Sequence, residues 1–232
     1  MVLSSVEWQI VLLSLKVSGV AILVTLPIAF ALAWVLARQR FAGKVLLDAI
    51  VHLPLVLPPV VTGWLLLLTF GANGPIGRFM AEWFGMTFVF HWTGAALAAA
   101  VMALPLMVRA MRLSIEAVDR KLEGAARSLG ASRRQVFVTV TLPLAVPGIL
   151  AAMVLGFARS IGEFGATITF VSNIPGESRT LPLAIYTALQ QPGAEPIAAR
   201  LALISVVLSL GALVASEVLV RQSGYGRGSH VL

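Results

Sequence analysis

The longest uncharged stretches of this chain restrict its fold more than any other feature of the sequence. The first runs from Val17 to Ala37 and is followed directly by Arg38-Gln39-Arg40. A helix rises about 1.5 Å per residue, so a stretch of this length can cross a hydrocarbon core of about 30 Å. Because 59% of the residues are hydrophobic and only 12% are charged, one soluble core could not enclose so much apolar surface. We therefore expect a membrane protein.

Five apolar runs predict an all-α integral membrane protein whose residues 1–232 form a single transmembrane domain. The predicted spans cover about residues 14–37, 45–70, 90–110, 136–160 and 200–220. Leu181–Leu189 is too short to span, so we expect a re-entrant or interfacial helix there. Residues 222–232 are glycine-rich and basic, which predicts a disordered tail. Because no basic segment precedes the first run, we expect it to stay in the membrane rather than be removed as a signal peptide.

The second predicted span contains three prolines, Pro54, Pro58 and Pro59. They should kink or break its helix because proline has no backbone N–H to donate. A bilayer tolerates a broken helix only where protein or a cavity surrounds the exposed backbone. Such a span either lines a path for a substrate or is a kinked packing helix, and the sequence leaves both possibilities open.

A polar stretch from Asp119 to Pro143 interrupts the apolar runs and predicts two helices separated by a turn. The Asp119 carboxylate can accept a hydrogen bond from a free backbone N–H, which is typical of a helix start. Gly130 suits the left-handed position after a helix, and Ser132 with Gln135 has the spacing of a capping box for the next helix. The first helix has a narrow apolar stripe, formed by Val118, Leu122, Ala125, Ala126 and Leu129.

The distribution of Lys and Arg predicts the orientation of the spans, because cytoplasmic loops are enriched in these residues. With the N-terminus outside, twelve fall on the inner side: Arg38, Arg40, Lys44, Arg109, Arg112, Arg120, Lys121, Arg127, Arg133, Arg134, Arg221 and Arg227. The outer side has three: Arg78, Arg179 and Arg200. We therefore expect an N-terminus outside, a C-terminus in the cytoplasm, and a cytoplasmic loop at residues 113–135.

Several functional classes have little support in the sequence. The net charge of +7 is spread between apolar runs, which favours contact with membrane lipid over a nucleic-acid partner. There is no cysteine, and His52, His91 and His230 lack the spacing of metal ligands, so we expect neither a metal site nor a membrane hydrolase. No glycine-rich phosphate-binding loop is present, so a separate ATPase would have to supply energy. A secondary transporter is disfavoured, because the proline-rich span has no counterpart in the second half of the chain.

The segment Glu123-Gly-Ala-Ala-Arg-Ser-Leu-Gly130, followed after nine residues by Val140-Thr-Leu-Pro143, resembles the EAA loop of ABC importer membrane subunits. It departs at Gly124, which stands where an acidic residue usually precedes the two alanines. The resemblance implies the type I permease fold of ABC importers and a cytoplasmic coupling helix that docks on an ATPase. The coupling residues that it implies are Asp119, Leu122, Glu123, Gly124, Ala125, Ala126, Arg127, Leu129 and Gly130. The alternative, a helix lying on anionic lipid, is disfavoured because the apolar face is small.

Three further segments, Leu53–Val60, Arg159–Phe170 and Asn173–Thr180, resemble the membrane subunit of bacterial molybdate importers, and this resemblance covers nearly the whole chain. Sulfate/thiosulfate importer subunits share the same general patterns and are the alternative. The resemblance implies a homodimer in the bacterial inner membrane, two ATPase subunits that bind ATP and Mg, and a periplasmic molybdate-binding protein. It implies no cofactor on this chain and a non-catalytic role, with molybdate as the transported ion and tungstate accepted.

A hydrated dianion crosses hydrocarbon only at high cost, so its route should be lined by neutral polar groups and helix ends. Candidates for this translocation path are Pro58, Pro59, Ser160, Gly162, Glu163, Gly165, Thr167, Ser172 and Asn173. The alternative is that these groups only satisfy one another at a helix contact. Arg159 and Glu163 have the spacing of an ion pair, and we favour a structural over a functional role for it.

Overall fold

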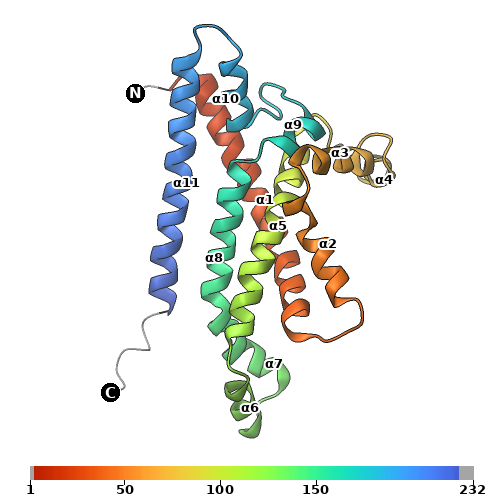
Figure 1. Ribbon diagram of the computed structural model, residues 1–232, viewed down its shortest axis with the longest axis vertical. Helices are drawn as coiled ribbons and strands as arrows, with labels where there is room; N and C mark the ends of the chain where they lie inside the picture. Colours follow the sequence, from red (N-terminus) through yellow and green to blue (C-terminus); the bar gives the residue numbers. More distant parts are fainter. Residues whose placement is uncertain (1–2, 225–232) are drawn as a thin grey trace.

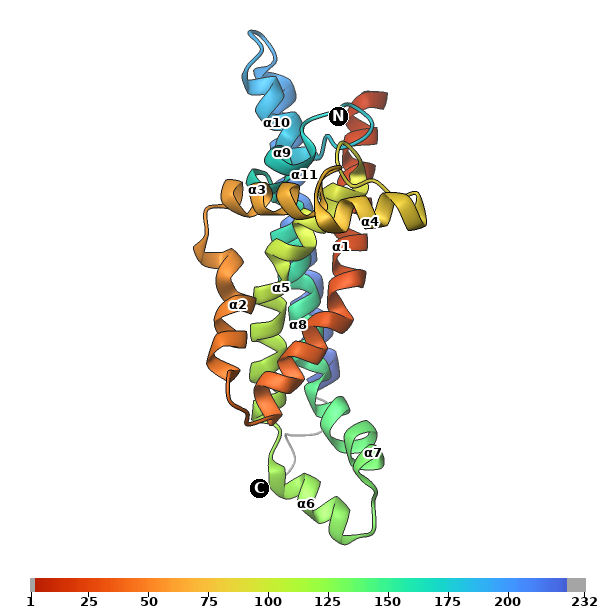
Figure 2. The same ribbon diagram turned by 90° about the vertical axis from the view of Figure 1, so that its right-hand side faces the viewer.

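The computed structural model describes residues 3–224, and all regular elements in that range are helices. They are α1 (Ser5–Arg38), α2 (Lys44–Val56), α3 (Pro59–Phe70), α4 (Pro75–Phe84), α5 (Trp92–Ala117), α6 (Arg120–Ser128), α7 (Arg133–Val136), the π-helix η1 (Phe137–Thr141), α8 (Leu142–Ile161), α9 (Gly165–Val171), α10 (Leu181–Leu189) and α11 (Glu195–Gly224). The long helices α1, α5, α8 and α11 run side by side (Figure 1). α6 and α7 lie at one end of this bundle, the α6 end, and α10 lies at the other, the α10 end (Figures 1 and 2).

Among the described residues, four helical segments are long and apolar enough to cross a membrane. They are Ser5–Arg38, Trp92–Ala117, Arg133–Ile161 and Glu195–Ala215. α2 and α3 would together form a fifth crossing, but they are bent by 115° at the break between them. The predicted all-α membrane fold with about five spans is thereby confirmed, and the second predicted span is broken, as its prolines indicated.

The break between α2 and α3 follows from the two adjacent prolines at its centre. Leu57 is extended, with φ −69° and ψ 142°, as a residue before proline prefers. Pro59 begins α3, at a position where the missing N–H would have no intrahelical partner in any case. Pro54, in contrast, lies inside α2 and does not end it. The expected break therefore occurs at Pro58, and α3 runs across the bundle instead of along it (Figure 2).

Helices α1, α5 and α11 extend beyond the predicted spans. α1 starts at Ser5, because the Ser4 hydroxyl accepts from the Glu7 N–H while the Glu7 carboxylate accepts from the Ser4 N–H. α5 continues past Arg112 to Ala117, within the stretch that we expected to be a loop. α11 continues to Gly224, so the predicted disorder does not begin at residue 222, and residues 225–232 lie outside the described residues.

The core between the long helices is built largely from small side chains. Four alanines of α5 are almost completely buried: Ala95, Ala98, Ala99 and Ala103. Gly156 of α8 lies so close to α5 and α1 that a Cβ there would be 2.7 Å from Met107 Sδ and 2.8 Å from Ile22 Cδ1. Small residues let membrane helices approach closely and gain dispersion contacts. This packing holds α5 between α1 and α8. These three membrane helices connect the α6 end of the bundle to the α10 end.

The α10 end is held by contacts between residues far apart in the sequence. Arg200, near the start of α11, forms an ion pair of 2.8 Å with Glu7, near the start of α1. The N–H of Leu181, the first residue of α10, donates to Ser14 Oγ on α1 at 2.7 Å. The short helix that we predicted is present with the expected bounds, whereas α9 was not predicted.

Candidate functional site

The predicted coupling segment forms α6, with the expected helix caps at both of its ends. The Asp119 carboxylate accepts from the Lys121 N–H at 2.8 Å and so starts the helix. Gly130 has φ +91°, a left-handed conformation that glycine adopts without steric cost. The capping box between Ser132 and Gln135 then begins α7. The local structure of this segment was therefore predicted correctly from its sequence.

Three residues of the predicted apolar stripe face away from the rest of the described chain, whereas Val118, just before α6, is buried and Ala126 is half-buried. Leu122 and Leu129 expose 51% and 90% of their surface, and Ala125 is also exposed. α6 buries none of its residues against the part of the chain that the structure describes. An exposed apolar patch on a protruding element is typical of a protein interface.

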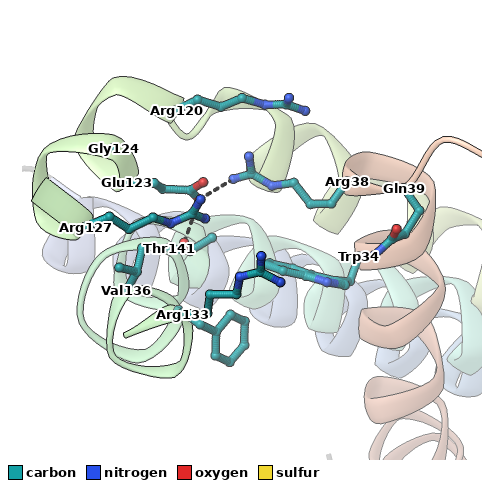
Figure 3. Close-up of a pocket in the computed structure, with 11 residues that line it drawn as sticks. Trp34, Arg38, Gln39, Arg120, Glu123, Gly124, Arg127, Arg133, Val136 and Thr141 are labelled. Carbon is teal, nitrogen blue, oxygen red and sulfur yellow. Dashed lines mark hydrogen bonds and ion pairs between the residues drawn. The ribbon is translucent and has the colours of Figure 1, made fainter. Parts of the chain in front are cut away.

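The opposite face of α6 turns toward the membrane helices, and Glu123 lies at its centre. Arg38 Nη2, at the end of α1, donates to Glu123 Oε1 at 2.8 Å. Thr141 is the last residue of η1, and its Oγ1 donates to the same oxygen at 2.7 Å (Figure 3). Only 13% of the Glu123 side chain is exposed, so water screens these bonds weakly. Glu123 thus ties α6 to α1 and to the helix that continues as α8.

The π-helix η1 joins this site to α1 through a second set of contacts. Phe137, its first residue, packs edge-on against Trp34 with ring centroids 5.1 Å apart. Trp34 in turn stacks on Phe30 at 6.3 Å. Single π-helical turns are rare and frequently occur at functional sites. Here the π turn has one end against the aromatic residues of α1 and the other at Glu123.

Between α6, α7 and the end of α1 lies a cavity of about 430 Å³. We call it the arginine cavity. Its walls are formed by Trp34, Arg38, Gln39, Arg120, Glu123, Gly124, Arg127, Arg133, Val136, Phe137 and Thr141 (Figure 3). Sequence reasoning missed Arg38, Trp34 and Thr141. The available signals were weak, since Arg38 is only the first charge after a span and Thr141 lies within the segment Val140–Pro143.

The candidates for a translocation path do not form one cluster. Gly165 and Pro59 meet where α9 contacts α3, because a Cβ on Gly165 would lie 2.7 Å from Pro59 Cβ. Thr167 is buried, whereas Pro58, Gly162 and Ser172 are exposed.

Ser160 and Asn173 differ in their hydrogen bonding. Ser160 Oγ is buried and has no hydrogen-bond partner among residues 3–224. Asn173, in contrast, donates to Thr187 Oγ1 at 2.7 Å and accepts from Arg179 Nε at 2.8 Å. Asn173 is therefore satisfied by one partner in α10 and one in the loop before it.

The Arg159–Glu163 pair forms at 2.6 Å, but its two residues do not belong to one helix. α8 ends at Ile161, and Glu163 follows the break. The second Glu163 oxygen accepts from the Ala166 N–H at 2.8 Å, in the first turn of α9. With both oxygens engaged, the carboxylate links the end of α8 to the first turn of α9. The structural role that we favoured for the pair stays a prediction.

The described residues contain no group of three or more His, Asp or Glu side chains that could hold a metal ion. His52 Nδ1 lies 3.2 Å from Asp48 Oδ1, one turn earlier in α2. Asp48 also accepts from Arg112 at 3.1 Å, which joins α2 to α5. His52 therefore belongs to a polar network between two helices.

Comparison with known proteins identifies the family of this chain. Residues 25–224 match the family of binding-protein-dependent transport system inner membrane components. The chain belongs to this family. It is therefore a multi-pass inner-membrane subunit of an ABC importer, as the EAA-like segment indicated. By family, the subunit works with an ATPase and a binding protein.

Several relatives resemble the chain along most of its length. The molybdenum transport system permease protein ModB of Escherichia coli (strain K12) is 61% identical over 96% of this chain and 97% of its own. ModB of Haemophilus influenzae is 57% identical over 94% and 96%. The sulfate transport system permease protein CysT of Salmonella typhimurium is 38% identical over 84% of this chain and 69% of its own.

Solved structures confirm the fold. A bacterial ABC transporter involved in the import of alginate matches with a TM-score of 0.74 at 20% identity, covering 95% of this chain and 80% of that one. The methionine transporter MetNI matches with a TM-score of 0.66 at 17% identity, covering 94% of each chain. At these identities the likeness shows the importer permease fold alone.

Proposed function

We propose that this family member moves molybdate, and also tungstate, across the inner membrane. This choice is supported by the similarity to ModB proteins. The ModB of Escherichia coli (strain K12) is 61% identical over 96% of this chain, whereas CysT is 38% identical over 84% of it. Sulfate and thiosulfate are the alternative substrates, since the CysT proteins are also related along most of this chain.

The proposed assembly is a homodimer of this chain with an ATPase subunit against each α6, and ATP and Mg bind to those ATPase subunits. The α6 end would face the cytoplasm and the α10 end the periplasm, where a molybdate-binding protein docks. The charge distribution supports this orientation, because Arg38, Lys44 and Arg112 lie toward the α6 end, while Arg179 and Arg200 lie at the α10 end. The exposed Leu122 and Leu129 would be covered by the ATPase.

In the proposed mechanism, closure of the ATPase dimer on ATP displaces α6. The bonds from Glu123 to Arg38 and Thr141 would pass this displacement to α1 and to η1, whose helix continues through the membrane as α8. One conformational equilibrium would then respond to nucleotide on one side and to the loaded binding protein on the other.

The proposed path for the anion lies near the break at Pro58–Pro59 and the contact of α3 with α9. Gly63 and Gly165 bring the two backbones together there, since a Cβ on Gly63 would lie 2.6 Å from the Ala166 carbonyl oxygen. Ser160 and Thr62 each have a buried hydroxyl without a hydrogen-bond partner in the described chain. Neutral hydroxyls can replace part of the hydration of a dianion without trapping it.

Uptake of labelled molybdate by the reconstituted permease–ATPase complex, with the binding protein present, tests this function. We expect uptake that requires ATP, competition by excess tungstate, and little competition by sulfate. Strong competition by sulfate, with no preference for molybdate, would assign the chain to sulfate transport. Uptake driven by an ion gradient without ATP would instead indicate a secondary transporter.

A further inference from the structure

The face of α6 that turns toward the membrane helices is strongly basic. Arg120, Glu123 and Arg127 are spaced three and four residues apart and so share one side of the helix, opposite Leu122 and Leu129. Arg133 of α7 and Arg38 of α1 complete the walls of the arginine cavity, which therefore brings four guanidinium groups and one carboxylate together (Figure 3).

The positive charge of the arginine cavity is not compensated within the described chain. The one carboxylate, Glu123, is already paired with Arg38 at 2.8 Å. Among the side chains that the structure describes, Arg120, Arg127 and Arg133 form no ion pair with an acidic residue. Arg38 Nε is buried and has no hydrogen-bond acceptor among the described groups. Like charges gathered around one space repel each other, so an anion in that space would stabilise the arrangement.

The position of the cavity indicates which anion fits. It lies between the last turn of α1 and the start of the membrane-crossing segment Arg133–Ile161. Trp34 forms part of its wall, and tryptophan is enriched at the level of lipid headgroups. Basic pockets between membrane helices at the cytoplasmic surface suit anionic headgroups, and the planar fork of arginine suits phosphate oxygens.

An acidic side chain of the ATPase is a less suitable occupant. The apolar stripe of α6, which an ATPase would cover, lies on the opposite side of the helix from the cavity. Leu129 on that stripe is 90% exposed, whereas the Glu123 side chain on the cavity side is only 13% exposed. The two faces of α6 are therefore available to two different partners.

We propose that the arginine cavity binds the phosphate group of an anionic phospholipid, held by Arg120, Arg127 and Arg133. α6 does not lie on the bilayer by its apolar stripe; its basic face covers a headgroup from the aqueous side. The bound phosphate lies beside the Arg38–Glu123 pair and helps to set the position of α6 relative to α1. The inference requires that the α6 end faces lipid headgroups, but it does not depend on which anion the importer transports.

The test uses the intact permease–ATPase complex in detergent, titrated with phosphatidylglycerol and, as a reference, phosphatidylcholine. Bound lipid is quantified by native mass spectrometry. The variant Arg120→Gln/Arg133→Gln removes two cavity cations. Its matched control, Lys121→Gln/Arg134→Gln, removes two cations from the neighbouring positions, which do not line the cavity. Molybdate uptake is measured separately, so that loss of the lipid site and failure of the proposed substrate are distinguishable.

We expect the wild-type complex to bind phosphatidylglycerol in preference to phosphatidylcholine. Each lost cation should weaken binding by about 1 kcal/mol, so the cavity variant should bind phosphatidylglycerol about thirtyfold more weakly. The affinity of the control should stay within about twofold of wild type. If the cavity variant does not assemble, Arg120→Lys/Arg133→Lys should assemble and show a smaller loss, because lysine keeps the charge without the fork.

Three results would overturn the proposal. Equal losses in the cavity variant and the control would indicate diffuse attraction to the basic surface. Absence of preferential binding in the wild-type complex would show that the cavity does not select an anionic headgroup. Displacement of the lipid by inorganic phosphate, with ionic strength matched by chloride, would assign the cavity to a free oxyanion.

Discussion

The two ends of the bundle are built in opposite ways. At the α6 end, a short helix with local caps protrudes from the membrane helices and is tied to them mainly by Glu123. At the α10 end, contacts between residues more than 160 positions apart, such as Ser14 with Leu181, bury the polar groups that they join. From this difference we expect the α6 end to move with a partner and the α10 end to hold its shape. Changes at the α10 end should therefore reduce stability, and changes at the α6 end should reduce coupling.

The largest expected effect on stability follows from Glu7→Ala at the α10 end. The Glu7 side chain is only 5% exposed and pairs with Arg200, so its removal leaves a partly buried guanidinium without its partner. Breaking a fully buried pair costs about 3–5 kcal/mol, and we expect about 2–3 kcal/mol here because 32% of the Arg200 side chain is exposed. Thermal unfolding in detergent should show a clear decrease in the midpoint temperature. Glu82→Ala removes an exposed carboxylate from α4 and should leave the midpoint nearly unchanged; equal shifts would contradict the role of the pair.

At the α6 end, Leu129→Asp should abolish coupling with little change in stability. The side chain is 90% exposed, so the substitution affects few contacts within the chain. If Leu129 is a central contact of the ATPase interface, its replacement should remove about 2 kcal/mol of binding free energy, which weakens ATPase binding about thirtyfold. Co-purification of the ATPase and molybdate uptake measure the effect.

Ser128→Asp is the matched control for this change, since it adds the same charge one residue earlier, on the flank of α6 between its two faces. It should retain most ATPase binding. Equal binding by wild type and Leu129→Asp would show that the apolar stripe is not the ATPase contact.

A third substitution, Glu123→Gln, separates coupling from assembly. The amide keeps the shape of the side chain but weakens the bonds to Arg38 and Thr141, at a cost of about 1–2 kcal/mol. The outer face of α6 is unchanged, so the ATPase should still bind. We expect ATP hydrolysis to continue, while the ratio of molybdate transported to ATP hydrolysed decreases. Thr141→Val, which removes only the hydroxyl donor, should give a smaller decrease in the same ratio, and an unchanged ratio in both variants would exclude Glu123 from transmission.

The same contrast explains which parts of the structure could be predicted from the sequence. α6 was predicted nearly completely because Asp119 and Gly130 act on their own neighbours in the chain. The position of the Glu123 carboxylate could not be predicted, since its partners Arg38 and Thr141 are 85 and 18 residues away. α9 was missed for a similar reason, because it is short and the Ala166 N–H in its first turn donates to the Glu163 carboxylate, which also pairs backward with Arg159.

The smallest expected effects come from two glycines of the α6 end and should have opposite signs. Gly130 has φ +91°, so Gly130→Ala forces a strained left-handed residue and should destabilise the helix end by about 1 kcal/mol. Gly124 lies inside α6, and an added Cβ would meet no atom within 4 Å outside the local helix backbone, so Gly124→Ala should stabilise the helix by about 0.5–1 kcal/mol. Hydrogen exchange of the α6 amides in the purified complex should become faster in the first variant and slower in the second. Since both positions are distant from the α10 end, exchange of the α10 amides should not change, and a change there would show that the two ends are not independent.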